Sequence, residues 1–197
     1  MNLRYLETNE IDTAAALCAR SFKDDPLFMF FFPNPKDRQK KACVFFRAQL
    51  KMCLSFTYVL DELSGIIIYQ RPTDHMRSLS IKDGFLLIIS VGIKAVLKAI
   101  VFQRFSKHQM KHHHQKYRDH LVLICVDEKE RNKGYATEMI HHFISSSTYL
   151  ETQNPDNIHF YQNLGFQLHH KEAFTTPSGS FDHILMVSES TKEEIYL

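Results

Sequence analysis

The segment from Leu121 to Ser146 constrains the fold of this 197-residue chain more than any other part of it. Residues 121–126 form an apolar run typical of a buried strand, and a polar loop follows directly. The chain then enters a predicted helix whose first residues are small or glycine. Because a helix N-terminus exposes free N–H groups and the positive end of the helix dipole, this junction is a candidate anion site in an α/β fold.

The residues of the junction suit a pyrophosphate. Gly134 lets the backbone approach an anion closely, Ala136 adds little bulk, and Arg131 and Lys133 add positive charge. The loop is not a Walker loop, because no Gly-Lys-Ser/Thr follows, and the three spaced glycines of the dinucleotide fingerprint are missing. A plain helix cap with solvated charges explains the same pattern equally well, so the pattern alone leaves both interpretations open.

The rest of the chain predicts an α/β domain around this junction. Apolar runs and turn residues predict strands at 2–6, 56–60, 66–69, 121–126, 149–152, 166–169 and 184–187. Helical periodicity predicts helices at 10–22, 36–55, 83–105, 131–146 and 155–164. We therefore expect one domain over residues 1–197, with a mixed sheet and helices on both of its faces.

A basic helical insertion of about residues 76–118 interrupts this pattern. Between Met76 and His120 there are nine Lys and Arg against two Asp, although the whole chain has a net charge of only +2. Lys94 and Lys98 lie within the apolar stretch 85–102, which disfavours a membrane span. The insertion is expected to cover the sheet as one long helix; a dimer contact and a membrane-surface helix are the alternatives.

Several classes of protein are excluded or disfavoured by composition. The small net charge indicates no nucleic-acid partner. The four cysteines are scattered without a C-x-x-C pair, and no signal segment is evident, so we expect a reduced, cytoplasmic protein. His112-His113-His114 is interpreted as a solvated basic turn, so no metal site is expected.

A second motif lies between Tyr149 and Phe166. Its predicted strand carries Leu150-Glu151-Thr152, and its predicted helix carries Asn157-x-x-Phe160-Tyr161-x-x-Leu164 before Gly165-Phe166. Asn157 and Tyr161 are four residues apart, so both lie on one face of the helix. Gly165 is a suitable residue to end it.

The two motifs together resemble a known family. Arg131-x-x-Gly134-x-Ala136 resembles the acetyl-CoA signature of the GNAT superfamily of N-acetyltransferases, and the second motif resembles the one that follows it there. The puromycin-N-acetyltransferase-like branch is the most similar, and Asp24-Asp25-Pro26 also resembles it. The resemblance implies the GNAT fold, a mixed sheet flanked by helices, with the helical insertion before the cofactor-binding strand.

The resemblance implies an N-acetyltransferase that transfers an acetyl group from acetyl-CoA to a primary amine of a small molecule by direct attack. The pantetheine arm would lie along Ile124, Cys125 and Val126, with the Val126 N–H near the thioester carbonyl. Asn157 would bond the pantetheine or its neighbourhood, and Tyr161 would be the general acid that protonates the leaving thiolate. The backbone N–H groups expected to hold the pyrophosphate belong to Arg131, Asn132, Lys133, Gly134, Tyr135, Ala136 and Thr137.

The proton-transfer residues have alternative interpretations. A phenol pKa of about 10 suits Tyr161 for the acid role, although a tyrosine packed on the sheet fits as well. Glu151 is the candidate general base acting through water, or else a structural carboxylate; His120 and Asp119 are rivals. Cys125 has no evident basic partner and is interpreted as a small packed residue rather than a nucleophile.

Three departures from the family pattern stand out. Glu128 replaces a common proline, and Asn132 replaces a common glycine, a position that asparagine tolerates if φ is positive. Only residues 137–148 separate the first motif from the strand of the second, and the resemblance leads us to expect about ten residues more. The helix and its link to the next strand must therefore be short. The alternatives to a small-molecule enzyme are a protein N-acetyltransferase or a non-catalytic CoA-binding or membrane-surface protein. The protein is expected to be a monomer or a homodimer.

Overall fold

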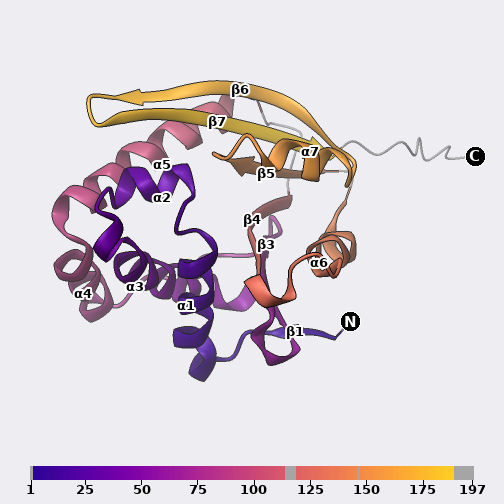
Figure 1. Ribbon diagram of the computed structural model, residues 1–197, viewed down its shortest axis with the longest axis horizontal. Coiled ribbons are helices and arrows are strands. Elements are labelled where there is room, and N and C mark those ends of the chain that lie inside the picture. Colours follow the sequence, from indigo (N-terminus) through magenta and orange to yellow (C-terminus); the bar gives the residue numbers. More distant parts are fainter. Residues whose placement is uncertain (1, 114–118, 146, 189–197) are drawn as a thin grey trace, which may run out of the picture.

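The computed structural model describes residues 2–113, 119–145 and 147–188. Seven strands form one mixed sheet in the order β1-β2-β3-β4-β5-β7-β6, in which only β4 and β5 run parallel (Figure 1). The strands are β1 Leu3–Tyr5, β2 Thr57–Leu60, β3 Gly65–Gln70, β4 Asp119–Val126, β5 Thr148–Thr152, β6 Phe166–Thr176 and β7 Gly179–Ser188. The predicted mixed α/β architecture is confirmed.

Helices cover both faces of the sheet. Those named α are α1 Ile11–Ser21, α2 Pro26–Phe31, α3 Pro35–Cys53, α4 Ile81–Val91, α5 Ile93–His113, α6 Tyr135–Phe143 and α7 Asn157–Gln162. Short 3-10 turns are η1 Thr8–Glu10, η2 Leu54–Phe56, η3 Asp61–Leu63 and η4 Glu128–Glu130. One core cluster joins α1–α5 to one face, and a second joins α6 and α7 to the other (Figure 1).

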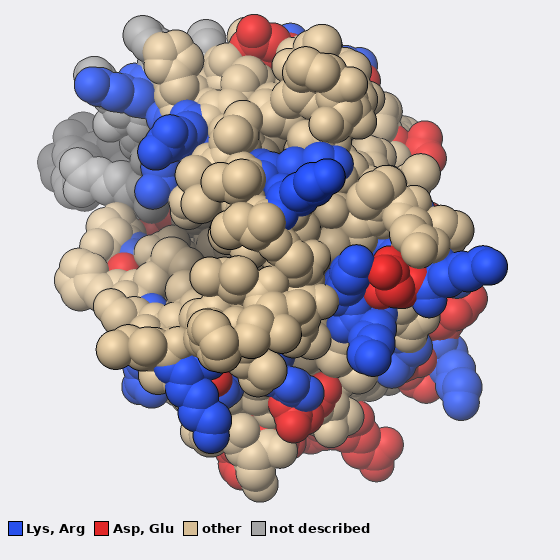
Figure 2. Space-filling view, turned by 90° about the vertical axis from the view of Figure 1, so that its left-hand side faces the viewer, with Lys and Arg blue, Asp and Glu red and all other residues tan. Residues whose placement is uncertain are grey.

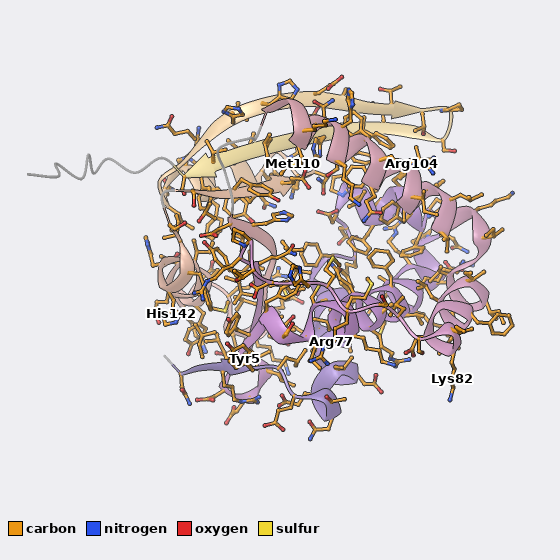
Figure 3. All side chains as sticks on the ribbon, turned by 180° about the vertical axis from the view of Figure 1, so that it is seen from behind. Tyr5, Arg77, Lys82, Arg104, Met110 and His142 are labelled. Carbon is orange, nitrogen blue, oxygen red and sulfur yellow. The ribbon has the colours of Figure 1, made fainter. Side chains whose placement is uncertain are left out.

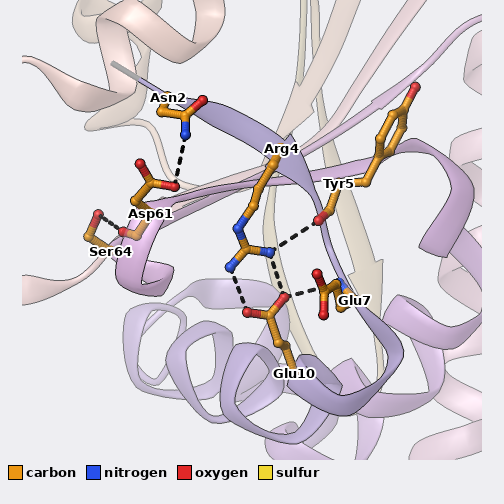
Figure 4. A network of polar contacts seen from close by, with 7 residues as sticks. All are labelled: Asn2, Arg4, Tyr5, Glu7, Glu10, Asp61 and Ser64. Atoms are coloured by element: carbon orange, nitrogen blue, oxygen red, sulfur yellow. Dashed lines mark hydrogen bonds and ion pairs between the residues drawn. The ribbon is translucent and has the colours of Figure 1, made fainter.

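Polar contacts hold the N-terminal edge strand in place. The guanidinium of Arg4 donates two hydrogen bonds to the carboxylate of Glu10, at 2.6 and 2.8 Å (Figure 4). Asn2 donates to Asp61 in the turn between β2 and β3, at 3.3 Å. These contacts connect β1 to the start of α1 and to the neighbouring hairpin, as a short strand at the edge of a sheet requires.

The short helix α2 is not among the predicted elements. The Asp25 side chain accepts a hydrogen bond from the Leu27 N–H at 2.9 Å, and Pro26 occupies the first turn. These are ordinary helix-start signals. The aromatic run that follows obscures the helical pattern, because almost every residue of it is apolar and its rings pack against α3, α5 and the β6–β7 hairpin.

The insertion consists of two helices, so the prediction of one helix over residues 83–105 is wrong. Gly92 has φ 87° and ψ 147°, a conformation that residues with a side chain rarely adopt. The chain bends there by 108° between α4 and α5. Among the described residues, no helix taken singly has the length and apolar character to cross a membrane, although the bent pair reaches that composition.

The strands β6 and β7 are longer than predicted. They pair from Phe166↔Ser188 to Thr176↔Gly179 and form a hairpin that reaches over α5 and α2. Phe174 and Phe181 near its tip contact the rings of Phe30 and Phe102. The hairpin therefore packs against the helices on the face of the sheet that the insertion covers.

Candidate active site

The strands β4 and β5 part in the middle of the sheet. They pair only from Asp119↔Thr148 to Leu121↔Leu150, whereas β4 continues to pair with β3 as far as Val126↔Gly65. The β3 partners pass from Tyr69↔Leu121 to Ile68↔Leu123, so β4 carries an extra residue at the point where it leaves β5. A bulge bends a strand, and it leaves the following segment of β4 with a backbone edge that β5 does not pair.

The loop after β4 has the geometry that the junction predicts. Asn132 has φ 64° and Gly134 has φ 85°, both in the left-handed region. Asparagine tolerates this conformation, which explains how it replaces the usual glycine. No side chain caps the first turn of α6, so the N–H groups of its first residues are open to an anion.

Some charged side chains around this loop form ion pairs with one another or with α1, and others are exposed to solvent. The ammonium of Lys133 pairs with Glu130 at 2.8 Å, while Arg131 is exposed. Asp127 caps η4 and pairs with Arg20 of α1 at 3.0 Å. The loop is therefore fixed at its start and exposes backbone at its end, where α6 begins.

The connection from α6 to β5 is short and held by hydroxyl groups. The hydroxyl of Ser145 donates to Asp119 at 2.7 Å, and the Thr148 hydroxyl accepts from the Ser145 N–H at 2.9 Å. The Tyr69 hydroxyl lies 2.7 Å from the Thr148 hydroxyl and donates to Asp119 at 3.1 Å. Since Asp119 is engaged in this structural network, it is disfavoured as a general base.

The second motif lies beside the gap between β4 and β5. The amide of Asn157 donates to the Thr152 hydroxyl at 3.2 Å, which ties α7 to the end of β5. Tyr161 is 9% exposed and packs on Phe166. Burial and, to a smaller extent, the charge of Asp25 raise the pKa of Tyr161, so its phenol stays protonated at neutral pH.

A deep apolar pocket of about 530 Å³ opens on the other face of the sheet. It is lined by α2, α3, both helices of the insertion, β4 and β5. Phe31, Phe32, Phe45 and Phe102 contribute aromatic walls. Phe28, Phe30 and Phe46 pack in the core instead. Such an apolar cavity with a few polar groups is typical of a small-molecule site.

Glu151 is the acidic side chain of this pocket. It accepts a hydrogen bond from the Ser106 hydroxyl of α5 at 2.8 Å, and His183 Nε2 lies 3.5 Å from its Oε1. Burial raises the pKa of Glu151, but the contact with His183, the positive charge that His120 and His183 can carry, and the Ser106 hydrogen bond lower it overall. The carboxylate therefore remains ionised at neutral pH at the end of an apolar cavity.

His120 also lines the pocket, where its ring stacks on Tyr149 at a centroid distance of 4.3 Å. Burial lowers the pKa of His120, an effect that the charge of Glu151 opposes. Burial therefore favours the neutral form of the ring. His120 thus lies in the pocket with Glu151, while Asp119 does not line it.

Three residues of this site lie outside the sequence-based predictions for proton transfer. Ser106 and His183 reach Glu151 from α5 and β7, and no local pattern marks either of them. Asp25 is the third: burial raises its pKa to about 6, although it also accepts backbone hydrogen bonds at the start of α2. Its position before a proline is a sequence signal for a helix cap, but its proximity to Tyr161 arises only in the tertiary structure.

Cys125 is a packed residue in this structure, as its surroundings show. Its Sγ lies 3.8 Å from that of Cys18, and both thiols are buried and free. The contact with Cys125 and burial raise the pKa of Cys18 well above its usual value. The burial of Cys125 among core side chains fits its interpretation as a small packed residue.

A second, more open cavity of about 1120 Å³ lies between α1, the β2–β3 turn and η4. Its carboxylates include Asp61, Glu62, Asp127 and Glu128, which would repel a pyrophosphate. The described residues contain no group of three or more His, Cys, Asp or Glu arranged for a metal ion. The predicted turn at His112-His113-His114 lies outside the residues whose side chains are described.

Comparisons with known proteins agree with this geometry. Residues 94–168 match the family described as an acetyltransferase (GNAT) domain. No match emerges among curated protein sequences.

The solved structures with a similar fold include several acetyltransferases. A histone acetyltransferase and related acetyltransferase from Corynebacterium glutamicum superposes with a TM-score of 0.63 at 15% identity, covering 98% of each chain. An N-acetyltransferase from Staphylococcus aureus gives 0.55 at 12% identity, covering 94% of this chain and 100% of its own. The C-terminal condensation domain of Ebony, in complex with β-alanyl-dopamine, gives 0.59 at 10% identity, covering 94% and 97%. The chain therefore has the GNAT fold, and its residues 94–168 match the GNAT acetyltransferase domain.

Proposed function

We propose that this protein is an acetyl-CoA-dependent N-acetyltransferase that acetylates a primary amine of a small molecule. The observation that carries the proposal is the gap between β4 and β5, which runs from the uncapped start of α6 to an apolar pocket with an ionised carboxylate. The gap offers a backbone edge for an extended cofactor arm, and the pocket offers room for an acceptor. Both lie next to residues of the predicted catalytic pair.

Acetyl-CoA supplies the activated acetyl group in this proposal. The unpaired edge of β4 at Ile124, Cys125 and Val126 would bind the pantetheine arm as an added strand would. The N–H groups from Arg131 to Thr137 would hold the pyrophosphate, because α6 lacks a side-chain cap. The N–H of Val126 would stabilise the negative charge that develops on the carbonyl oxygen.

Glu151 is proposed as the general base. Its carboxylate takes a proton from the ammonium form of the acceptor, directly or through water, and the neutral amine then attacks the acetyl carbonyl. A second proton leaves the nitrogen as the C–S bond breaks, and it replaces the proton that the general acid gives to the thiolate. Ser106 and His183 orient the carboxylate and keep it ionised. Tyr161 is proposed as the general acid that donates its phenolic proton to the leaving thiolate, since its raised pKa keeps the phenol protonated.

The shape of the pocket supports a small hydrophobic acceptor. The insertion helices enclose the cavity, whereas a protein substrate needs an open groove. A structure with the same fold holds β-alanyl-dopamine, which is a small aromatic molecule. Membership of the puromycin-N-acetyltransferase-like branch and a cytoplasmic location remain part of this proposal.

Calorimetry with acetyl-CoA, followed by a mass-spectrometric screen of an amine library, tests the proposal. We expect acetyl-CoA to bind and hydrophobic primary amines to gain an acetyl group. Absence of acetyl-CoA binding would overturn the proposal. Binding without acetylation of any amine or peptide would instead favour the non-catalytic alternative, and acetylation of peptides alone would favour the protein acetyltransferase.

Two variants test the proposed roles. Tyr161→Phe and Glu151→Gln should each lower kcat by about 10²–10⁴-fold, because each removes one proton-transfer group. Calorimetry should find that both variants still bind acetyl-CoA. The matched controls are Tyr5→Phe and Glu62→Gln, which change exposed residues away from the pocket and should leave kcat unchanged.

A further inference from the structure

The helices α4 and α5 expose a broad apolar surface to solvent. We define the docking face by six of its side chains, whose exposed fractions range from 48% to 94%: Ile81, Phe85, Ile89, Ile93, Leu97 and Val101. Figure 2 shows this side of the molecule, where an uncharged area with a hollow is bordered by Lys and Arg, with Asp and Glu among them at its lower and right margins. Soluble monomers rarely expose contiguous apolar patches of this kind, so the face indicates an interaction site.

The same helices are strongly basic. Residues 81–113 contain six Lys and Arg against one acid, Asp83, which Lys51 of α3 binds at 2.6 Å. Lys98 turns inward, where its ammonium donates to the Phe30 carbonyl and lies over the Phe30 ring. Others are exposed, and Lys82 and Arg104 project from α4 and α5 (Figure 3). The face therefore combines apolar side chains with an excess of positive charge.

We propose that the docking face binds the surface of an anionic lipid bilayer. Apolar side chains enter the boundary between headgroups and acyl chains, while Lys and Arg attract the lipid phosphates and carboxylates. The 108° bend at Gly92 fits helices that lie at the surface rather than one that spans. A symmetric contact between two copies is disfavoured, since it would bring like charges together.

Docking would also place the pocket beside the bilayer. Leu87 and Val91 of α4 and Val96 of α5 line the pocket, so the two helices lie between the docking face and the cavity. An amphiphilic amine dissolved in the membrane would then reach Glu151 from the lipid side. This consequence rests on the proposed function, whereas bilayer binding does not depend on it.

Co-sedimentation of the full chain with vesicles, without acetyl-CoA or amine, tests the proposal. We expect binding to phosphatidylcholine vesicles that contain phosphatidylserine, weak binding to phosphatidylcholine alone, and loss of binding at high salt. Phe85→Ser with Ile89→Ser should weaken the partition coefficient about tenfold or more. Lys82→Gln with Lys94→Gln should weaken it about fivefold for each charge removed.

Matched controls separate the face from general effects. Tyr5→Ser changes an exposed aromatic far from α4 and α5, and Lys129→Gln with Lys133→Gln removes two charges from the loop after β4; neither should change binding. Circular dichroism should show the same fold for every variant. The proposal is overturned by equal binding to both vesicle types, by no binding, or by a dimer in light scattering that Phe85→Ser with Ile89→Ser dissociates. A failure of the acetylation screen leaves this result unaffected.

Discussion

Asp25 combines a structural role with a charge that reaches the proposed acid. Its carboxylate caps α2, and burial raises its pKa to about 6. The same charge contributes to the raised pKa of Tyr161. Because the folded protein holds the Asp25 proton more tightly than the unfolded chain, this group stabilises the fold most at acidic pH, and that stabilisation is lost as the pH rises through about 6.

Asp25→Asn should therefore stabilise the protein at neutral pH. Asparagine keeps an oxygen for the cap but carries no charge to bury, so we expect the free energy of unfolding at pH 7 to rise by about 1–3 kcal/mol. The gain should disappear below about pH 4, where the wild-type carboxyl is protonated in both states. Urea unfolding at several pH values measures this effect. Asp24→Asn, at the exposed neighbour, is the matched control and should change the free energy of unfolding at pH 7 by less than about 0.5 kcal/mol.

Gly134 is the position on which the proposed pyrophosphate site depends. Its φ of 85° strains any side chain, although no heavy atom lies within 4 Å of where a Cβ would be. Gly134→Val should weaken acetyl-CoA binding at least about tenfold and lower the stability by about 1–3 kcal/mol. Gly179→Val, at φ 140° in the β6–β7 turn, should lower the stability without weakening that binding. Calorimetry and thermal unfolding distinguish the two, and unchanged affinity in Gly134→Val would contradict the assignment.

The insertion shows how one residue shapes an element. Its apolar run predicts a single helix, and the insertion contains two glycines that have different roles. Gly84 lies inside α4 with no neighbour near its missing Cβ, whereas Gly92 forms the bend between α4 and α5. Because the chain bends there, both helices line the pocket.

Alanine substitutions at these two positions should have opposite effects. Gly92→Ala should destabilise the protein by about 1–3 kcal/mol, because its backbone conformation suits glycine alone. Gly84→Ala should stabilise it by about 0.5–1 kcal/mol, because alanine favours a helix interior and nothing obstructs its methyl group. Chemical unfolding measures both. Equal effects would show that Gly92 is not a special backbone position.

The whole molecule assembles the pocket from elements that are far apart in the chain. Helices from the N-terminal half, the insertion and the sheet each contribute one wall, and Glu151 closes the end. Tyr161 packs on one face of the sheet and Glu151 lines the pocket on the other, so in the proposed mechanism both would reach the acetyl group through the gap between β4 and β5.

Filling the pocket should affect the acceptor alone. Ala99 lines the cavity, and Ala99→Phe should raise the KM for a hydrophobic amine about tenfold or more while acetyl-CoA affinity is kept. Ala173→Phe, on the exposed edge strand β6, should change neither quantity. Steady-state kinetics on an amine found in the screen gives the comparison. An unchanged KM in Ala99→Phe would place the acceptor elsewhere.

Local patterns predict most of the elements and much of the site. The strand at 121–126, the helix start near Gly134 and the order of the second motif follow from apolar runs, small residues and turn signals. The missed features are α2, the bend at Gly92 and the full lengths of β6 and β7. Neither α2 nor the bend could be predicted, because both lie in segments where nearly every residue is apolar. In such a segment the hydrophobic pattern has no helical or strand period.

The amino-acid sequence was sufficient for the cofactor-side motif, because its determinants are neighbours in the chain: a strand, a loop that tolerates positive φ, and an uncapped helix start. Ser106, His183 and Asp25 were assigned only by the tertiary structure, since they reach Glu151 or Tyr161 from distant segments. The separation of β4 from β5 was also visible only in the tertiary structure, because strand pairing depends on partners far along the chain. Local propensity cannot encode such contacts, whereas packing of the whole sheet and its helices does.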